Sequence, residues 1–364
     1  NNIVTIQPDS LRILHNPLTG WVLYASMGVD AADFWAQYDH MYIPELGHNV
    51  SVTDYAHTLY IRASWTDFNP QEDVYGWKID SNLRAYIEGA YQRNMRLAFR
   101  VVVDSRDKRT EFTPQFVKDA GAKGFMNKGK WSPYSDDSVF QKYYTKFVKA
   151  LAKDFNDPSK VEFIDGFGLG KWGEYHTMIY STGDDTPKKA VFDWVTDIYS
   201  QVFDKVPVVI NYHRWIGAGK DWVDDEHFAA DSEEMLEEAI KKGYSLRHDA
   251  FGMTTYYGSW ERRFAKKYRN ICPIIMEGGW IVKSHSYWQD PRGYRKDSHE
   301  DVRRGEFDDS KEAHVNMMDF RFGDTESWFK DAFDLVRRFL REGGYRLYPS
   351  EISLPLEVSK KTTP

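Results

Sequence analysis

The stretch Leu97-Ala-Phe-Arg-Val-Val-Val, residues 97–103, decides the fold. It is apolar almost throughout and rich in β-branched residues, and Val206-Pro-Val-Val-Ile has the same character further along the chain. A strand that faces water on one side alternates apolar and polar residues, whereas a strand covered on both faces does not. These two runs therefore predict a parallel sheet with helices on both sides.

The rest of the chain alternates such runs with amphipathic segments. The predicted strands are Gly20–Ser26, His57–Ser64, Arg96–Asp104, Val161–Leu169, Val206–Tyr212, Asp249–Thr255, Cys272–Glu277 and His314–Phe320. The predicted helices are Ile79–Arg93, Val139–Phe155, Lys188–Phe203, Ser232–Lys242, Trp260–Arg269 and Thr325–Glu342. Eight strands with intervening helices predict an α/β fold, a (β/α)₈ TIM barrel with long loops at the carboxyl ends of its strands. A doubly wound open sheet is the alternative, but no Gly-x-Gly-x-x-Gly turn follows the first strand.

Composition excludes several classes of protein. The 364 residues have a net charge of −7, which argues against nucleic-acid binding because phosphate contacts require a basic face. No apolar run approaches the ~18 residues of a membrane span. The single cysteine excludes an intrachain disulfide and a cysteine-based zinc site. What remains is an acidic globular protein in which 16% of the residues are aromatic.

The two ends of the chain give expectations about processing and domains. The start Asn-Asn-Ile-Val-Thr-Ile has neither Met nor an apolar signal region, so we expect a signal peptide to have been removed. A secreted, periplasmic or cell-surface protein would follow. We assign residues 1–348 to the barrel and 349–364 to a C-terminal extension. The extension contains the strand pattern Glu351-Ile-Ser-Leu, either the stub of a β-sandwich domain or a strap on the barrel.

Two glutamates follow apolar runs on opposite sides of the predicted barrel. Glu174 lies just past the fourth strand, in Gly168-Leu-Gly-Lys-Trp-Gly-Glu-Tyr-His, and Glu277 closes the seventh, in Pro273-Ile-Ile-Met-Glu-Gly-Gly-Trp. A carboxylate at such a position is costly unless it faces a cavity. Retaining glycoside hydrolysis needs two carboxyl groups about 5 Å apart, and facing strand ends can hold them there. The alternative is that each glutamate forms an ordinary salt bridge.

This arrangement resembles the clan A glycoside hydrolases, (β/α)₈ enzymes with an acid/base on strand four and a nucleophile on strand seven. The resemblance covers Gly20 to about Gly344. Asn16-Pro-Leu-Thr-Gly-Trp and Gly170-Lys-Trp-Gly-Glu-Tyr-His are also similar to glycosidase-like barrels of polysaccharide-degrading bacteria, which often carry a β-sandwich after the barrel. The resemblance implies Glu174 as the acid/base and Glu277 as the nucleophile.

The resemblance also implies supporting residues. Arg62 on strand two would keep Glu277 ionised by lowering its pKa. Tyr256 or Tyr257, after strand six, would hydrogen-bond the nucleophile, and His213 would orient the acid or a sugar hydroxyl. The clan commonly has Asn before the acid/base, where this chain has Gly173. That departure leaves an inverting enzyme open, which would need a wider carboxyl separation and a base drawn from Asp67, Asp104 and Asp165.

Six of the 13 tryptophans fall at or just beyond strand ends: Trp65, Trp172, Trp215, Trp260, Trp280 and Trp288. Flat aromatic rings stack on the C–H faces of sugars, so this set predicts a carbohydrate-binding cleft. Packing beneath long loops is the alternative for each one. The cationic loop Trp280–Arg304 either meets an anionic sugar or forms a solvated face.

The sequence therefore predicts a retaining glycosidase that cleaves a plant or algal poly- or oligosaccharide by double displacement, without a cofactor. The alternatives are an inverting glycosidase and a non-catalytic carbohydrate-binding barrel. A metal-dependent hydrolase has little support, because no His-Glu-x-x-His occurs. Carbohydrate is the expected partner, with neither nucleic acid nor a membrane span. The sugar, the linkage and the oligomeric state are not determined by the sequence.

Overall fold

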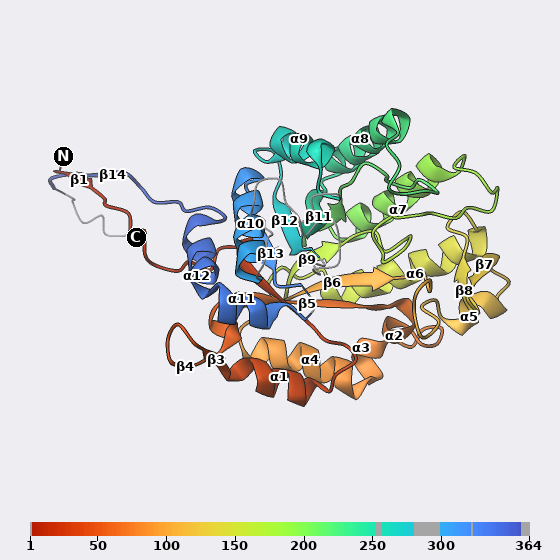
Figure 1. Ribbon diagram of the computed structural model, residues 1–364, viewed down its shortest axis with the longest axis horizontal. Coiled ribbons are helices and arrows are strands. Elements are labelled where there is room, and N and C mark those ends of the chain that lie inside the picture. Colours follow the sequence, from red (N-terminus) through yellow and green to blue (C-terminus); the bar gives the residue numbers. More distant parts are fainter. Residues whose placement is uncertain (1, 252–255, 280–298, 322, 358–364) are drawn as a thin grey trace, which may run out of the picture.

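The computed structural model describes residues 2–251, 256–279, 299–321 and 323–357. Eight parallel strands form a closed barrel in chain order, and the last pairs with the first (Figure 1). They are β2 (Gly20–Tyr24), β5 (Ala56–Ser64), β6 (Arg96–Val102), β9 (Val161–Asp165), β10 (Val208–Asn211), β11 (Ser245–Phe251), β12 (Ile274–Gly278) and β13 (Met317–Asp319). The predicted (β/α)₈ barrel is confirmed.

Helices surround the barrel, as the amphipathic segments predict. The long ones are α1 (Ala31–Asp39), α4 (Ser81–Gln92), α6 (Ser138–Phe155), α7 (Lys188–Val202), α8 (Glu226–Lys241), α9 (Ser259–Tyr268), α10 (His299–Glu312) and α12 (Phe333–Glu342). Shorter ones are α2 (Trp65–Phe68), α3 (Gly76–Ile79), α5 (Gln115–Asp119), α11 (Thr325–Asp331) and the 3₁₀ turn η1 (Val52–Asp54). Asp80 caps α4 by accepting a hydrogen bond from the Leu83 amide at 2.7 Å. The predicted helix Thr325–Glu342 is divided at Ala332 into α11 and α12.

The inside of the barrel has two layers, because alternate residues of each strand point inward. The lower layer is mainly apolar, and its members are Val22, Tyr60, Ala98, Phe163, Val209, Ile275 and Met317, with Arg247 as the one charged member, from β11. Two residues further along each strand, the upper layer consists of Tyr24, Arg62, Arg100, Asp165, Asn211, Asp249, Glu277 and Asp319. The floor of the barrel mouth is therefore charged.

Strand β11 begins four residues before its predicted start, at Ser245. Its first half is Ser245-Leu-Arg-His-Asp, which lacks the apolar run expected of a covered strand. Arg247 and Asp249 are nevertheless buried, because ion pairs inside the barrel compensate their charges.

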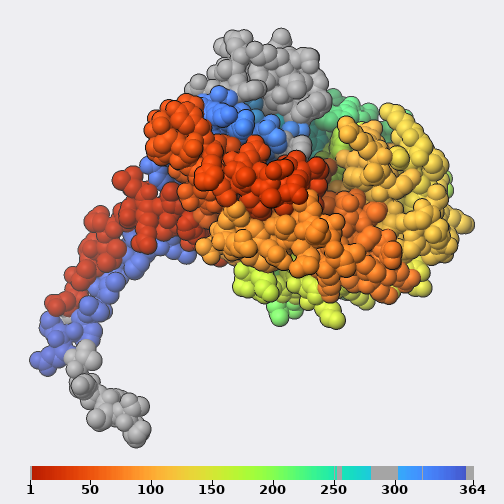
Figure 2. All heavy atoms as spheres, turned by 90° about the horizontal axis from the view of Figure 1, so that it is seen from below, coloured from red at the N-terminus to blue at the C-terminus, as the bar shows by residue number. Residues whose placement is uncertain are grey.

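The two ends of the chain pair with each other outside the barrel. Strand β14 (Glu351–Leu354) lies antiparallel to β1 (Asn2–Thr5), so the C-terminal strand pattern has a partner. The pair forms an arm that extends from the barrel, as Figures 1 and 2 show, and all of its strand residues are exposed. Two further hairpins, β3–β4 (Met41–Ile43, His48–Val50) and β7–β8 (Gly124–Asn127, Lys130–Pro133), lie in loops. No helix among the described residues is long and apolar enough to span a bilayer.

Candidate active site

Glu174 lies in a tightly folded loop that follows β9. Lys171 and His176 form an isolated antiparallel bridge across it, and Gly173 has a φ of +75°. A side chain at position 173 would be strained by that φ and would also approach the Arg100 Cδ to 3.4 Å. The His213 Nε2 lies 2.8 Å from the Glu174 carbonyl oxygen, so His213 supports the backbone that presents Glu174.

The Glu174 carboxyl group is buried and held by arginines. The Arg100 Nη1 donates to its Oε1 at 2.8 Å, and the Arg62 Nη2 lies 3.8 Å away. Burial, reinforced by Asp249, outweighs both cations and raises the pKa of Glu174 to about 7. A carboxyl group with this pKa is still partly protonated near neutral pH and suits a general acid.

Glu277 ends β12 and faces the same space. The Arg247 Nη2 donates to its Oε2 at 3.1 Å. Burial raises the pKa of Glu277 well above its ordinary range, and the charges of Asp249 and Asp319 add to that rise against the pull of Arg247. The expectation that the pKa of Glu277 is lowered is therefore wrong, since buried carboxylates surround it.

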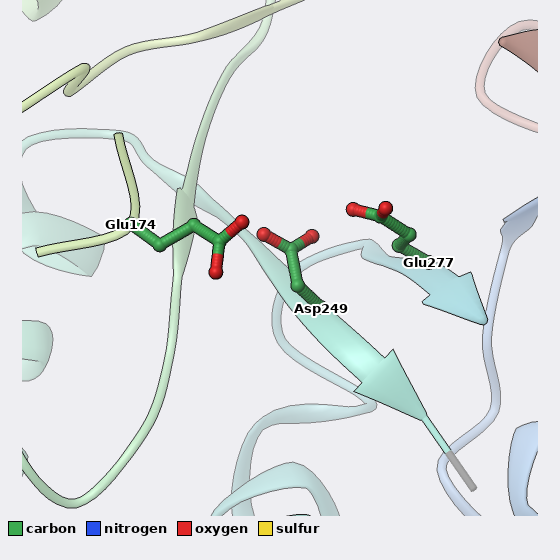
Figure 3. Close-up of side chains that lie close together, drawn as sticks. All are labelled: Glu174, Asp249 and Glu277. Carbon is green, nitrogen blue, oxygen red and sulfur yellow. The ribbon is translucent and has the colours of Figure 1, made fainter. Parts of the chain in front are cut away.

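Asp249, from β11, lies between the two glutamates (Figure 3). One carboxylate oxygen from each of Glu174, Asp249 and Glu277 lies within 4.8 Å of the others. Although burial favours the neutral acid, Arg100 and Arg247 hold the pKa of Asp249 well below its ordinary value, at N–O distances of 2.7 and 2.8 Å. Hydrogen bonds from both glutamic acid side chains also stabilise its charged form.

The same three carboxylates are the candidate metal ligands among the described residues. Both oxygens of Asp249 already accept from guanidinium groups, so the cluster is built as an ion-paired network. Asp165 and Asp319 extend this network through ion pairs with Arg100 and Arg247 respectively. The arginines give the carboxylates fixed orientations, which general acid/base and nucleophilic chemistry require.

A second set of polar contacts lies beside Glu174. The His176 Nδ1 is 2.6 Å from Asp221 and its Nε2 is 2.7 Å from the Tyr256 hydroxyl. Burial lowers the pKa of His176, but Asp221 and Glu174 outweigh it and raise the value overall. His176 also stacks on His213 at 4.0 Å between ring centroids.

These side chains line a cavity of about 350 Å³ at the barrel mouth. Its lining residues are Arg62, Trp172, Glu174, His176, Trp222, Asp249, Tyr256, Glu277, Gly278 and Arg321. Trp222 is 54% exposed and presents a ring at the rim. The cavity thus combines three carboxyl groups at its base with two indole rings around it, which is a geometry that suits a sugar.

The structure brings together some of the predicted supporting residues and separates others. Arg62 lines the cavity, but its closest carboxylate is Glu174, and Arg247 is the cation beside Glu277. Tyr256 also lines the cavity, but its hydroxyl pairs with His176 and not with Glu277. Tyr257 lies behind the site, stacked on Phe251 at 4.1 Å.

Of the six predicted sugar-stacking tryptophans, Trp172 lines the cavity. Trp65, Trp215 and Trp260 are buried, so the prediction that they meet sugar is wrong. Trp65 packs against Tyr144 of α6, Trp215 stacks behind Tyr256, and Trp260 stacks on Phe264. The helices of the outer ring pack closely against the barrel, so an indole ring that follows a strand can be enclosed between the strand and a helix. Trp280 and Trp288 lie outside the described residues, as does most of the cationic loop Trp280–Arg304.

The candidate bases for an inverting enzyme lie elsewhere. Asp165 is buried below the cavity on Arg100 and Tyr60, Asp104 pairs with Arg106, and Asp67 caps α2. The carboxylate that does line the cavity, Asp249, was missed, together with Arg100, Arg247, His176 and Trp222. Two of these residues, Arg100 and Asp249, could have been found from the sequence, because each stands two positions after another inward-facing residue of its strand, Ala98 and Arg247 respectively.

Comparison with known proteins supports the fold. No protein-family model and no curated protein matches the sequence. Among solved structures, the endo-1,4-β-mannanase from Rhizomucor miehei has a TM-score of 0.50 and 10% identity, over 85% of this chain and 87% of that one. A GH10 protein from Paenibacillus barcinonensis has a TM-score of 0.48 and 12% identity, over 85% and 88%.

The exo-β-1,4-mannosidase from Opitutaceae bacterium strain TAV5 also matches, with a TM-score of 0.48 and 12% identity over 90% of this chain. The present chain spans 55% of the length of that mannosidase. The predicted resemblance to (β/α)₈ glycoside hydrolases is confirmed at the level of the fold, by the mannanase and by the closed eight-stranded barrel.

Proposed function

We propose that this protein is a retaining glycoside hydrolase acting on a poly- or oligosaccharide. The observation that carries the proposal is the placement of Glu174 and Glu277 at the base of one cavity, with carboxylate oxygens within 4.8 Å. Retaining enzymes need about 5 Å between their carboxyl groups, whereas inverting enzymes leave about 6.5–9.5 Å for a water molecule. The shorter separation favours double displacement.

In the first step, Glu174 protonates the glycosidic oxygen while the Glu277 carboxylate attacks the anomeric carbon. The C–O bond to the leaving group breaks, and a glycosyl ester of Glu277 forms. In the second step, Glu174 takes a proton from water, which attacks the same carbon and releases Glu277. Each of the two displacements inverts the anomeric carbon, so the product keeps the anomeric configuration of the substrate.

The charge of the cluster fits an oxocarbenium-like transition state. Three guanidinium groups, of Arg62, Arg100 and Arg247, face five carboxyl groups, of Asp165, Glu174, Asp249, Glu277 and Asp319. With two protons bound, the cluster is neutral. The reaction needs Glu174 protonated and Glu277 ionised, which leaves one negative charge to stabilise the developing positive charge of the sugar.

Other properties belong to the same proposal. Trp172 and Trp222 would stack on the sugar rings, and His213 and His176 would keep the Glu174 loop in place. We keep the division into a barrel, residues 1–348, and an extension, residues 349–364. Secretion to the periplasm, cell surface or medium and a plant or algal polysaccharide as substrate are parts of this proposal.

A substrate screen with paired variants tests the proposal. Aryl glycosides of both anomers and plant and algal polysaccharides would be incubated with the wild type, Glu174→Gln and Glu277→Gln. We expect each variant to lose at least about a thousandfold in kcat/KM, because each removes a group that acts on the reacting atoms. Proton NMR of the first-formed product should show the anomer of the substrate.

Glu162→Gln is a matched control, because Glu162 is a buried glutamate at the opposite end of β9 and pairs with Arg96 at 2.8 Å. This variant should keep wild-type kcat/KM. Activity within tenfold of wild type in both Glu174→Gln and Glu277→Gln would overturn the assignment. Release of the inverted anomer would overturn the retaining mechanism, but the assignment as a glycosidase would stand.

A further inference from the structure

A second cavity of about 350 Å³ adjoins the first. Arg62, Glu277 and Arg321 line both cavities, so the second one begins at the proposed nucleophile. Its remaining charged lining residues are Asp67 and Lys108. A ligand that fills the first cavity can therefore extend into the second one past Glu277.

Lys108 is the most informative residue in this second cavity. It is half-buried, and its ammonium group makes no hydrogen bond or ion pair within the part of the chain that the structure describes. Its nearest described aromatic ring is that of Phe112, 5.3 Å away. Burial and the like charge of Arg62 lower the pKa of Lys108 to about 8, against the smaller opposing effects of Glu174, Asp107 and Asp104. A bound anion would relieve both effects.

The two arginines of the shared wall add to this positive charge. The Arg62 guanidinium donates to neutral acceptors, the Tyr24 hydroxyl and the Trp172 carbonyl, and its nearest carboxyl group is Glu174 at 3.8 Å. Arg321 is held at the rim, because its backbone amide donates to Asp319 at 2.8 Å. The Arg321 Nη1 forms an ion pair with Asp324 at 3.7 Å.

The acidic residues of the cavity do not cancel these cations. The Asp67 carboxylate accepts from the Ser64 amide in the capping box of α2, where the helix N-terminus compensates its charge. The cavity therefore has three cationic side chains, of Arg62, Lys108 and Arg321, against two carboxyl groups, of Asp67 and Glu277.

We infer that this cavity binds an anionic group of the substrate, a carboxylate or a sulfate ester on a sugar that adjoins the scissile bond. The inference rests on the proposed glycosidase function and narrows its substrate to acidic poly- or oligosaccharides. Arg62 and Arg321 offer planar forks that match a carboxylate or a sulfate, and Lys108 offers a point charge between them. A neutral sugar would leave the Lys108 ammonium without an acceptor.

Binding measurements test the inference on the full chain. Glu174→Gln serves as the background, since it slows turnover and its side chain does not line the second cavity. The probes are oligogalacturonate, a sulfated galacto-oligosaccharide, and neutral galactan and mannan oligosaccharides of equal length, titrated by calorimetry. At least one anionic probe should bind about tenfold or more tightly than its neutral counterpart, and the two anionic probes distinguish carboxylate from sulfate.

Lys108→Gln should abolish that preference, whereas Lys146→Gln should leave it within twofold. Lys146 is a control for net charge, because it is exposed and paired with Glu72 and Asp73 at 2.8 Å. Equal binding of neutral and anionic probes, or a preference that survives Lys108→Gln, would overturn the inference.

Turnover by the wild type separates this inference from the proposed function. Anionic probes that bind through Lys108 but are never hydrolysed would support the second cavity and count against the glycosidase. Hydrolysis that requires Glu277, with kcat/KM equal for anionic and neutral substrates and unchanged for both in Lys108→Gln, would establish the glycosidase and overturn the anionic subsite.

Discussion

Substitution of Asp249 by Asn tests how the cluster sets its own protonation. Asp249 is an anion fixed between Glu174 and Glu277, and its charge raises the pKa of both. Asn has nearly the same shape and keeps an acceptor oxygen, but it removes the charge. The pKa of each glutamate should therefore fall, and the bell-shaped pH profile of kcat/KM should move to lower pH.

The structure bounds the size of this shift. Two unit charges at 4.8 Å in an effective dielectric of about 20 interact by about 3.5 kcal/mol, which corresponds to about 2.5 pKa units. That would account for the whole rise in the pKa of Glu174 from its ordinary 4.5 to about 7, of which burial is the larger cause. Because Asp249 raises the pKa of both glutamates, we expect both limbs of the profile to move down by about one pH unit.

The assay is kcat/KM from pH 4 to 9 on whichever glycoside the screen identifies, at a temperature where the variant is folded. Loss of a carboxylate that pairs with two buried arginines should also lower the free energy of unfolding by about 3–5 kcal/mol. Asp165→Asn is the control, because Asp165 also pairs with Arg100 but does not line the cavity. An unchanged profile in Asp249→Asn, or an equal shift in Asp165→Asn, would refute the reasoning.

Three further predictions concern packing, acid stability and the C-terminal extension. Trp65→Ala should lower the free energy of unfolding by about 3–5 kcal/mol and spare KM, whereas Trp222→Ala should raise KM and spare the melting temperature; denaturant titration and kinetics distinguish the two. Melting temperature should fall as pH drops from 6.5 towards 4, because folded His57 and His248, with pKa values of about 4 and 3, stay neutral while the unfolded chain binds protons. His57→Gln should reduce that fall, and an equal fall would contradict it. Deletion of residues 349–364 should leave the melting temperature unchanged, since β14 is exposed and pairs with the exposed β1; a drop of more than about 5 °C would contradict this.

The barrel was predictable because its strands are covered on both faces. Runs such as Leu97-Ala-Phe-Arg-Val-Val-Val differ clearly from the amphipathic helices between them, and the (β/α)₈ count followed. The exception is β11, where Arg247, His248 and Asp249 interrupt the apolar pattern. A rule that expects apolar residues in a covered strand misses a strand such as β11, whose buried charges compensate one another in ion pairs.

The sequence predicts which tryptophans follow a strand end, but it does not predict which of them face the cavity. Trp65 and Trp172 both follow a strand end in the sequence. Trp65 is nevertheless buried against Tyr144 of α6, whereas Trp172 lines the cavity. Trp222 lies in a loop with no strand pattern nearby, and it forms part of the rim. Distance from a strand end does not give the direction in which a side chain points.

The sequence by itself determined the eight-stranded barrel and the positions of Glu174 and Glu277 at its strand ends, because hydrophobic periodicity is local and barrel geometry brings strand ends together. Only the tertiary structure decided which groups surround them. Asp249 between the glutamates, Arg100 and Arg247 beside it and Lys108 near them come from three separate segments, β11, β6 and the loop after β6. The pKa of a carboxyl group depends on charges within a few ångströms in space, and closure of the barrel sets those distances.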